Sequence, residues 1–597
     1  MEQTYKLLVQ DKTYSSYKFL NTTTNEDADP ELFKHIHPLE DRLFSKDIIS
    51  YNNHCPIKSY KTVYSNIKSG IHLAGVLILE NNKTFGRTAN KKRLLYKCIP
   101  DDKHLPVFLV PYETSIGFSK IFTNKYVLFK YDSWETTHPN GILVEVIGDV
   151  NDPTVFYEYQ LHCKSIHISL KDITKRTKDI FVKKSAIEKE AHSEYINQIL
   201  ENPQYSIEDR RMTHRVFTID PNKSVDFDDG FSITEHPNNT IQISIYIANV
   251  FFWLETLDLW KSFSSRVSTI YLPDRKRPML PTVLSDNLCS LHQDQIRFTL
   301  VMDMFWKLSE DSIKPKYELI DIQYKHAAIN VFKNYRYEEP DLLYRCPDYK
   351  RLFEITTIMD KSVSDSHDLV SYWMTQMNQC CGRWLSDRKI GIFRSAVYKN
   401  HLVYDSLLND PSLNELSHDA QRVVTNWNNT AGQYVVYTPD CSLEHQVMKT
   451  TSYVHITSPI RRLVDLLNMM WFSREFGLLK SVSKESLEFF YNWLLKIDYI
   501  NDSMRAIRKI QTDCELIHRC YTSPFILDTI YEGIVFGKLV KNDGSILYMV
   551  YLDSIRILSR ITTHIDISNF TRGHFKIFLF EDEDRFKKKI RVQLIEL

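Results

Sequence analysis

Four aspartates in one short stretch have the residue type and spacing to carry chemistry. Asp220, Asp226, Asp228 and Asp229 lie within ten residues, beside a strand-like run. Carboxylates held close together repel one another, so a fold that gathers them needs a cation to offset the repulsion. Hard oxygen ligands suit Mg²⁺ or Mn²⁺ rather than zinc. The spacing therefore predicts a magnesium site, and the alternative is a solvated acidic loop.

A second group of polar residues follows the apolar run 453–456, in the order Thr457-Ser458-Pro459-Ile460-Arg461-Arg462. Serine is a natural N-cap and proline a natural first helical residue, so we expect a helix to start at Ser458. Arginines in a first turn oppose the helix dipole, whereas a phosphate would be attracted both to that end and to the guanidinium groups. The pattern favours phosphate binding, with surface salt bridges such as Arg462 with Asp465 as the alternative.

The segment from Tyr271 to Pro281 is punctuated by prolines, which exclude regular helix and a central strand. We therefore expect an irregular loop. Its tyrosine could stack on a base and its basic residues could hold phosphates, while an exposed connecting loop is an equal alternative.

The elements that must position these residues are a sheet and a set of helices. Isoleucine alternates with other residues from Ile241 to Ala248, which predicts a strand with one buried face. The aspartates are then expected in a turn beside a sheet. From Val370 onward helical spacing dominates, and a basic run at 171–184 is interpreted either as a linker face or as a track for a phosphate backbone.

Short apolar runs predict three small β-barrels. The first two groups of strands cover 71–111 and 125–161, the latter including Phe156–Leu161, and the third covers 530–594. Barrels of this size bind single-stranded nucleic acid or serve as spacers, and the pattern leaves both open. Residues 1–60 show no clear period and receive no role.

Composition bounds the classes of protein that remain possible. A chain of 597 residues exceeds one hydrophobic core, so we expect roughly three to five domains. The 75 basic and 75 acidic side chains cancel, which neither supports nor excludes a nucleic-acid partner. Ten cysteines without C-x-x-C spacing indicate free thiols in a reducing compartment. With no signal-peptide core or apolar span, we expect a soluble intracellular protein without a membrane partner, the cytoplasm being favoured over the nucleus.

The motifs together resemble the RNB family of 3′–5′ exoribonucleases, which includes ribonuclease II, ribonuclease R and Dis3 (Rrp44). All four aspartates stand at the family spacing; Tyr271-Leu-Pro and Pro278-Met-Leu-Pro resemble the next block, and Thr457 to Arg462 the second signature. Upstream, Asp132-Ser-Trp134 with His138-Pro-Asn-Gly141 resembles the second cold-shock barrel of Dis3-like members. Residues 1–60 are too short for a PIN endonuclease domain, so the resemblance implies exonuclease activity alone.

The resemblance implies a multidomain α+β fold. It comprises tandem OB-like (cold-shock) barrels at 61–112 and 113–195, a mixed α/β RNB catalytic domain at 196–525 and an S1-like OB barrel at 526–597. It also implies a processive, Mg²⁺-dependent enzyme that hydrolyses single-stranded RNA to nucleoside 5′-monophosphates, using one or two ions for which Mn²⁺ can substitute. A monomer is expected, unless the chain joins an RNA-decay complex.

Family positions assign the expected roles. The four aspartates hold metal, Asp228 and Arg461 are catalytic, and a further set contacts RNA: Tyr271, Tyr398, Ser458, Arg461 and Arg462. The chain departs from the family at Tyr246 and Asn249, where a histidine and an acid are usual, and at Ser371 and Tyr372, where acids are common. The alternative functions are therefore an RNA-binding protein that has lost hydrolysis and a structural subunit of an RNA-decay assembly.

Overall fold

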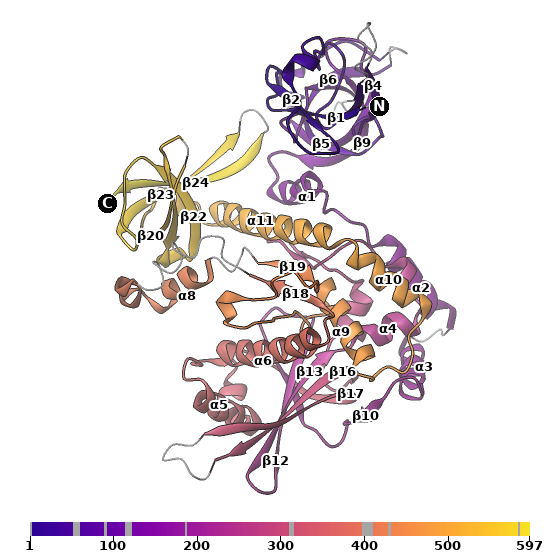
Figure 1. Ribbon diagram of the computed structural model, residues 1–597, viewed down its shortest axis with the longest axis vertical. Helices are drawn as coiled ribbons and strands as arrows, with labels where there is room; N and C mark the ends of the chain where they lie inside the picture. Colours follow the sequence, from indigo (N-terminus) through magenta and orange to yellow (C-terminus); the bar gives the residue numbers. More distant parts are fainter. Residues whose placement is uncertain are drawn as a thin grey trace.

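The computed structural model of the chain is organised around a central mixed sheet, with smaller β-domains at both ends of the sequence (Figure 1). The structure describes all residues except 1–2, 52–59, 89–91, 114–121, 185–187, 310–315, 397–409, 428–431, 542 and 583–585. The mixed α+β class expected from the sequence is confirmed.

The N-terminal residues form a folded unit, although the sequence showed no clear period there. Four strands pair in the order β2-β1-β3-β4: Gln3–Val9 (β1), Tyr17–Asn21 (β2), Ile48–Tyr51 (β3) and Tyr60–Tyr64 (β4). Tyr5, Leu7, Phe19 and Phe33 share its core. Every second side chain of β1 from Tyr5 is buried, so the alternation is real but is surrounded by turn residues that obscure it.

The strands expected in two successive barrels form a single closed one, which corrects the boundary placed at 112. Its strands are Leu73–Leu77 (β5), Leu94–Pro100 (β6), Phe108–Tyr112 (β7), Lys125–Ser133 (β8) and Asn140–Asp149 (β9). The order β5-β6-β7-β9-β8 closes because β5 pairs with both β6 and β8, while β7 runs parallel to β9. The first group supplies three of these strands and the second group two, so neither group closes a barrel alone.

Residues 156–161 are helical rather than a strand, which is a second correction. They lie in α1 (Pro153–Cys163), whose first turn is capped by the Asp152 side chain and starts with a proline. These two start signals outweigh the β propensity of the aromatic residues. The basic run at 171–184 is α2 (Lys171–Lys184), followed by α3 (Glu188–Leu200), and these helices lead into the central domain.

The central sheet has six strands in the order β10-β17-β11-β12-β13-β16, and the long strand β17 also pairs with β16. The strands are Ile207–Asp209 (β10), Val216–Asp220 (β11), Asp229–His236 (β12), Thr240–Ala248 (β13), Ile296–Leu308 (β16) and Tyr317–Arg336 (β17). Strand β13 is buried on both faces, not on one as expected. Its isoleucines pack into one core while Tyr246 and Ala248 pack into another, because helices cover both sides of the sheet.

Helices surround the central sheet and extend to the C-terminal domain (Figure 1). Their bounds are Val250–Thr256 (α4), Pro347–Met359 (α5), Ser366–Asp387 (α6), His418–Trp427 (α8), Leu463–Glu475 (α9), Lys484–Leu494 (α10), Ile497–Thr522 (α11) and Phe525–Asp528 (α12). A two-stranded antiparallel sheet of Ile392–Ser395 (β18) and Gln433–Val436 (β19) lies beside α11. Among the described helices, none has the length and apolar character needed to cross a bilayer.

The C-terminal domain is a five-stranded antiparallel sheet in the order β22-β21-β20-β23-β24. Its strands are Ile530–Val540 (β20), Ile546–Leu552 (β21), Ile557–Thr563 (β22), Arg572–Asp582 (β23) and Lys587–Glu596 (β24). The hairpin of β23 and β24 reaches the N-terminal barrel (Figure 1). There the Tyr126 hydroxyl donates to the Phe586 carbonyl at 2.8 Å, and Lys587 forms an ion pair with Asp101. These contacts link two domains that are distant in sequence.

Candidate active site

A pocket of about 790 Å³ opens at one edge of the central sheet and is lined by all four aspartates. Other polar residues that line it include Tyr271, Lys276, Tyr337, Asn378, Ser458, Arg461 and Arg462. The three motifs singled out in the sequence therefore meet at one place, although they are separated by up to 242 residues.

The aspartate turn is held by backbone contacts on both sides. Asp220 is the last residue of β11 and Asp229 the first of β12, so the two strands deliver these carboxylates to one edge. The Phe227 N–H donates to Ser290 Oγ at 2.9 Å, and Ala248 N–H donates to the Asp228 carbonyl at 2.8 Å. These bonds hold the carboxylates in place, as expected for a turn beside a sheet.

Three of the aspartates have strongly perturbed acidity. Burial raises the pKa of Asp220 to about 7, with the charge on Asp228 adding to the rise. Burial likewise raises the pKa of Asp228 to about 7, and that of Asp229 to about 8 with Asp220 as a further cause. The protein itself therefore supplies too little positive charge to stabilise the ionised carboxylates, which favours a bound cation.

Asp228 ties the aspartate turn to the arginine motif. One carboxylate oxygen accepts a hydrogen bond from the Ile460 N–H at 3.0 Å, and the other accepts from Arg461 Nε at 3.2 Å. The Asp228 side chain is almost fully buried, whereas Arg461 is 42% exposed and can reach a ligand. Because Asp228 belongs to the aspartate turn, the position of the Arg461 guanidinium depends directly on that turn.

Asp226 has a different partner, which the sequence did not predict. Lys276 Nζ lies 3.2 Å from an oxygen of Asp226 and 2.9 Å from an oxygen of Asp286. Lys276 belongs to a short strand, Lys276–Arg277 (β15), that pairs with Ile270–Tyr271 (β14). The contacts of Lys276 with these two acids form only when separate segments meet in the fold. No local spacing in the sequence could therefore have identified this bridge.

The arginine motif does not start a helix, which corrects the expectation at Ser458. Residues 458–461 form a turn, and α9 begins at Leu463. The Ser458 N–H donates to Asp465 at 2.8 Å, and Arg462 Nη2 donates to the same oxygen at 2.8 Å. Because Asp465 and Asp228 take these donors, the chain before α9 follows the pocket wall instead of the helix axis.

The remaining sites expected to contact RNA differ in their surroundings. Tyr271 is 43% exposed at the pocket wall and is free to stack on a ligand. Ser458 Oγ accepts from Arg461 Nη2 at 2.9 Å, so it orients the guanidinium. Tyr398 lies outside the described residues. Tyr337 was not predicted; it lines the pocket and stacks on His367 with ring centroids 3.6 Å apart.

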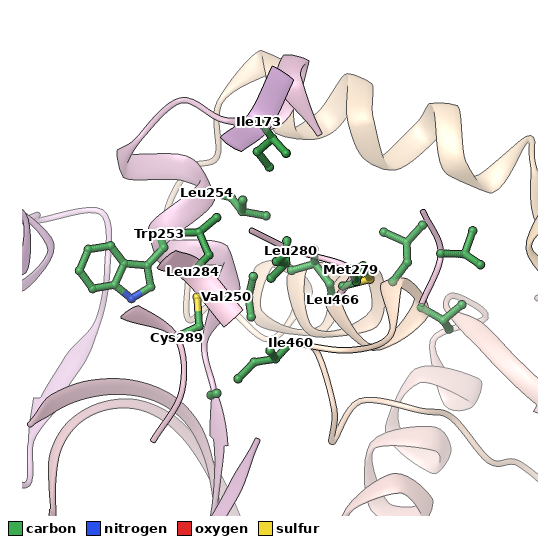
Figure 2. Packing of buried hydrophobic residues seen from close by; sticks show 14 of the residues in the cluster. Ile173, Val250, Trp253, Leu254, Met279, Leu280, Leu284, Cys289, Ile460 and Leu466 are labelled. Carbon is green, nitrogen blue, oxygen red and sulfur yellow. The ribbon is translucent and has the colours of Figure 1, made fainter. Parts of the chain in front are cut away.

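A shared hydrophobic core fixes the two motifs that surround the aspartates. Figure 2 shows Ile460, from the arginine turn, near Leu466 of α9 and close to Met279 and Leu280 from the loop that carries Tyr271. Val250 of α4 packs in the same cluster. Because packed interiors resist displacement, this core holds Arg461 and Tyr271 in a constant relation.

The residues that depart from the family pattern have local roles. Tyr246 is fully buried and its hydroxyl hydrogen-bonds with Ser232 Oγ at 2.9 Å. Asn249 caps α4 by accepting from the Phe252 N–H at 3.4 Å. Ser371 lines the pocket, so the wall formed by α6 carries a neutral group there.

The donor set of the pocket fits a hard divalent cation. Asp220 Oδ2 is buried and has no hydrogen-bond partner within the described part of the chain. Asp229 adds a second carboxylate whose ionised form is disfavoured by burial. Oxygen donors of this kind are those that Mg²⁺ prefers. Asp228 and Asp226 already have protein partners, so Asp220 and Asp229 are the best candidates for direct ligands.

Two family models match the chain. The RNB domain matches residues 209–351 and 342–473, which include the central sheet and the arginine motif. The Dis3-like cold-shock domain 2 (CSD2) matches residues 95–156, within the closed barrel and α1.

Curated relatives are ribonucleases of this kind. Ribonuclease R of Chlamydia pneumoniae is 24% identical over 305 residues, 42% of this chain and 45% of the relative. DIS3-like exonuclease 2 of Schizosaccharomyces pombe is 36% identical over 99 residues, 16% of this chain and 10% of the relative. Exosome complex exonuclease RRP44 of Homo sapiens is 22% identical over 253 residues, 41% and 23% of the two chains. Each alignment covers less than half of the relative.

Solved structures share the fold across almost the whole chain. Mycoplasma genitalium RNase R in complex with ribose methylated single-stranded RNA has a TM-score of 0.65 at 16% identity, covering 99% of this chain and 100% of that one. Yeast Ssd1, a pseudonuclease, has a TM-score of 0.55 at 13% identity, covering 96% and 80%. At these identities the likeness concerns the fold alone, which hosts both a ribonuclease and a pseudonuclease.

Proposed function

The chain belongs to the RNB family, and from this premise we propose that it is a Mg²⁺-dependent 3′–5′ exoribonuclease. It hydrolyses single-stranded RNA processively and releases nucleoside 5′-monophosphates. The observation that carries this proposal is the meeting of Asp220, Asp228 and Asp229 with Arg461 in one pocket. Acidic groups alone would hold a cation, whereas an exposed guanidinium beside them adds a place for a phosphate.

Asp220 and Asp229 would hold the metal, with Asp226 and Asp228 beside them. When bound, Mg²⁺ would supply an electrophile that favours ionisation of an attacking water and offsets charge on the phosphate; a second ion is compatible with four carboxylates, and Mn²⁺ shares the same ligand preference. The bond from phosphorus to the 3′ oxygen breaks as water adds to phosphorus, and the released nucleotide keeps the 5′ phosphate.

The protein groups position the RNA end. Arg461 would donate its guanidinium N–H groups to the non-bridging oxygens of the terminal phosphodiester, where negative charge increases during the reaction. Asp228 and Ser458 fix its orientation. Tyr271 would stack on a base near the 3′ end, which suits a sequence-tolerant enzyme because every base has a π-face. Arg462 and Tyr398 are proposed as further RNA contacts.

A specific observation keeps a binding-only function as a second candidate. Lys276 already offsets the charge of Asp226, so one of the four carboxylates expected to bind metal is paired with a protein cation instead. A chain with this arrangement could retain RNA without cleaving it. Single-stranded RNA is the proposed partner under both functions, and association with an RNA-decay complex is proposed as an addition; otherwise the chain acts as a monomer in the cytoplasm.

Incubation of the purified protein with single-stranded RNA separates the two candidates. RNA labelled at its 3′ end should release labelled mononucleotide at once in Mg²⁺ and stay intact in EDTA. RNA labelled at its 5′ end should disappear without a ladder of intermediates if degradation is processive. Retention of RNA in a gel shift without mononucleotide release would refute the enzyme and favour the binding function.

A further inference from the structure

Three arginines converge beside the aspartate pocket, around the side chain of Tyr434. Arg394 on β18 is the direct cross-strand partner of Tyr434 on β19, and its guanidinium lies 5.2 Å from the centre of the tyrosine ring. The Tyr434 hydroxyl shares a hydrogen bond of 2.8 Å with Nδ1 of His455, which lines the aspartate pocket. Helix α11 contributes the second arginine, Arg508. The third, Arg462, immediately precedes α9.

Helix α11 is fixed against the β18–β19 pair, which sets the backbone position from which Arg508 extends. Asn501 accepts a hydrogen bond from the Tyr434 N–H at 2.7 Å and donates one to the Tyr434 carbonyl at 2.8 Å. Arg508 stands seven residues after Asn501, two helical turns along the same face. Its side chain therefore lies on the side of the helix that contacts β18 and β19. Burial raises the pKa of Tyr434, and the nearby charges of Arg462, Arg394 and Arg508 oppose that rise.

The positive charge of this cluster exceeds the negative charge supplied by the protein. Arg462 is paired with Asp465, and its Nε is buried without a hydrogen-bond partner among the described residues. Neither Arg394 nor Arg508 has a carboxylate partner in the described ranges of the chain. Burial lowers the pKa of Arg394 to about 10, with the charges of Arg508 and Arg462 as further causes. Partly buried guanidinium groups without a counter-ion are costly to the folded protein.

An anionic ligand would offset this charge, and the place of the cluster indicates which one. We propose that Arg394 and Arg508, together with Arg462, form a binding site for a backbone phosphate of single-stranded RNA, upstream of the phosphodiester held by Arg461. The inference rests on the proposed function. An RNA strand whose 3′ end lies at the aspartates must leave the pocket along one wall, and His455 and Arg462 connect that wall to the cluster. Guanidinium forks match phosphate oxygens in a bidentate geometry.

The first test measures RNA binding in EDTA, so that hydrolysis plays no part. Arg508→Gln and Arg394→Gln should each weaken binding of a single-stranded oligonucleotide about tenfold, the equivalent of about 1.4 kcal/mol. Each should also make the slope of log affinity against log salt shallower by about 0.7, the value for one phosphate contact on a single strand. Arg505→Gln is the matched control, since Arg505 lies on the same helix but is exposed and paired with Asp502. It should bind like the wild type.

The second test locates the contacted phosphate on the wild-type protein and then compares the wild type with Arg508→Gln. Single phosphates near the 3′ end of the oligonucleotide are replaced one at a time by uncharged methylphosphonates. One upstream linkage should weaken binding to the wild type by about tenfold and to Arg508→Gln by much less, because the contact is already missing. Unchanged affinity and salt slope for both arginine variants, or equal losses for wild type and variant at every linkage, would overturn the site. Mononucleotide release is scored separately, so a binding-only protein would refute the enzyme while leaving the phosphate site intact.

Discussion

Replacement of Asp228 by asparagine is the sharpest test of the proposed centre. Asparagine has nearly the same shape, and its carbonyl oxygen can still accept from the Ile460 N–H, which Asp228 receives at 3.0 Å. The other side-chain atom becomes an amide nitrogen, which is a donor, and it faces Arg461 Nε at the position of a 3.2 Å contact. The substitution therefore keeps the turn but removes the anchor of the guanidinium.

The expected loss of activity is large. Removing one preorganised donor at a reacting oxyanion costs on the order of 10²–10³ in rate, and displacement of Arg461 should cost at least that much. Loss of one negative charge next to the metal ligands adds to it. We expect kcat to fall by about 10³ or more, with RNA binding in EDTA within about threefold of the wild type, since Tyr271 and the arginines outside the turn remain.

The same substitution should stabilise the protein in the absence of metal. Burial raises the pKa of Asp228 from 3.8 to about 7, so the folded protein binds a proton more tightly than the unfolded chain does. Stability from this group is therefore present at low pH and is lost as pH rises between these two values. At pH 8 the loss is at most on the order of 4 kcal/mol, and Asp228→Asn removes it.

The assay pairs two measurements on one preparation. Single-turnover release of 3′-labelled mononucleotide gives the rate, and thermal unfolding in EDTA at pH 6 and pH 8 gives the stability. Asp228→Asn should be slow yet melt higher than the wild type, with the larger difference at pH 8. Asp226→Asn is the control, since Lys276 already offsets that charge, and it should lose less activity. A rate near that of the wild type would refute the role of Asp228, and a lower melting temperature would refute the electrostatic argument.

Three further predictions follow from the same geometry. Lys276→Met should tighten Mg²⁺ binding in calorimetry, because the pocket loses one positive charge, while Lys276→Arg should bind like the wild type; unchanged affinity for the methionine variant would contradict the bridge. Mg²⁺ affinity should rise from pH 6 to pH 8.5 with release of protons, because burial raises the pKa of Asp220 to about 7 and that of Asp229 to about 8 and protons compete with the ion; calorimetry in buffers of different ionisation enthalpy measures the release, and pH-independent binding would exclude the competition. Tyr271→Ala should raise the KM for RNA by about fivefold or more, as expected for a lost stack of about 1–3 kcal/mol, while Tyr271→Phe should retain the wild-type value; equal losses would assign the role to the hydroxyl.

The sequence predicted which residues line the pocket better than it predicted which side chains those residues contact. The spacing of the aspartates and the strand after them predicted a turn beside a sheet, because both depend on neighbours along the chain. The bridge from Lys276 to Asp226 and the stack of Tyr337 on His367 depend on segments that meet only after folding. Local patterns carry no information on such meetings, and a single sequence offers no other source.

The errors in the fold have the same origin. The strands of the N-terminal barrel were recognised individually, but their division into two barrels required knowledge of which strand pairs with which. Closure is decided by the pairing of β5 with β8, which brings Leu73 opposite Phe129 across a long stretch of sequence. At 156–161 the local signals conflicted, and the cap at Asp152 with Pro153 decided for helix.

The failed helix start at Ser458 is informative about the site itself. Ser458 and Pro459 carry the local signals for a helix, yet the helix begins at Leu463 because buried carboxylates take the donors of the intervening turn. A strong local preference is overridden only where tertiary contacts determine a different geometry. One of those contacts is Asp228, which thereby places Arg461 beside the aspartates rather than on a helix surface. The departure from the local rule and the proposed catalytic arrangement thus have a single cause, so a substitution that restores the helix should also displace the guanidinium.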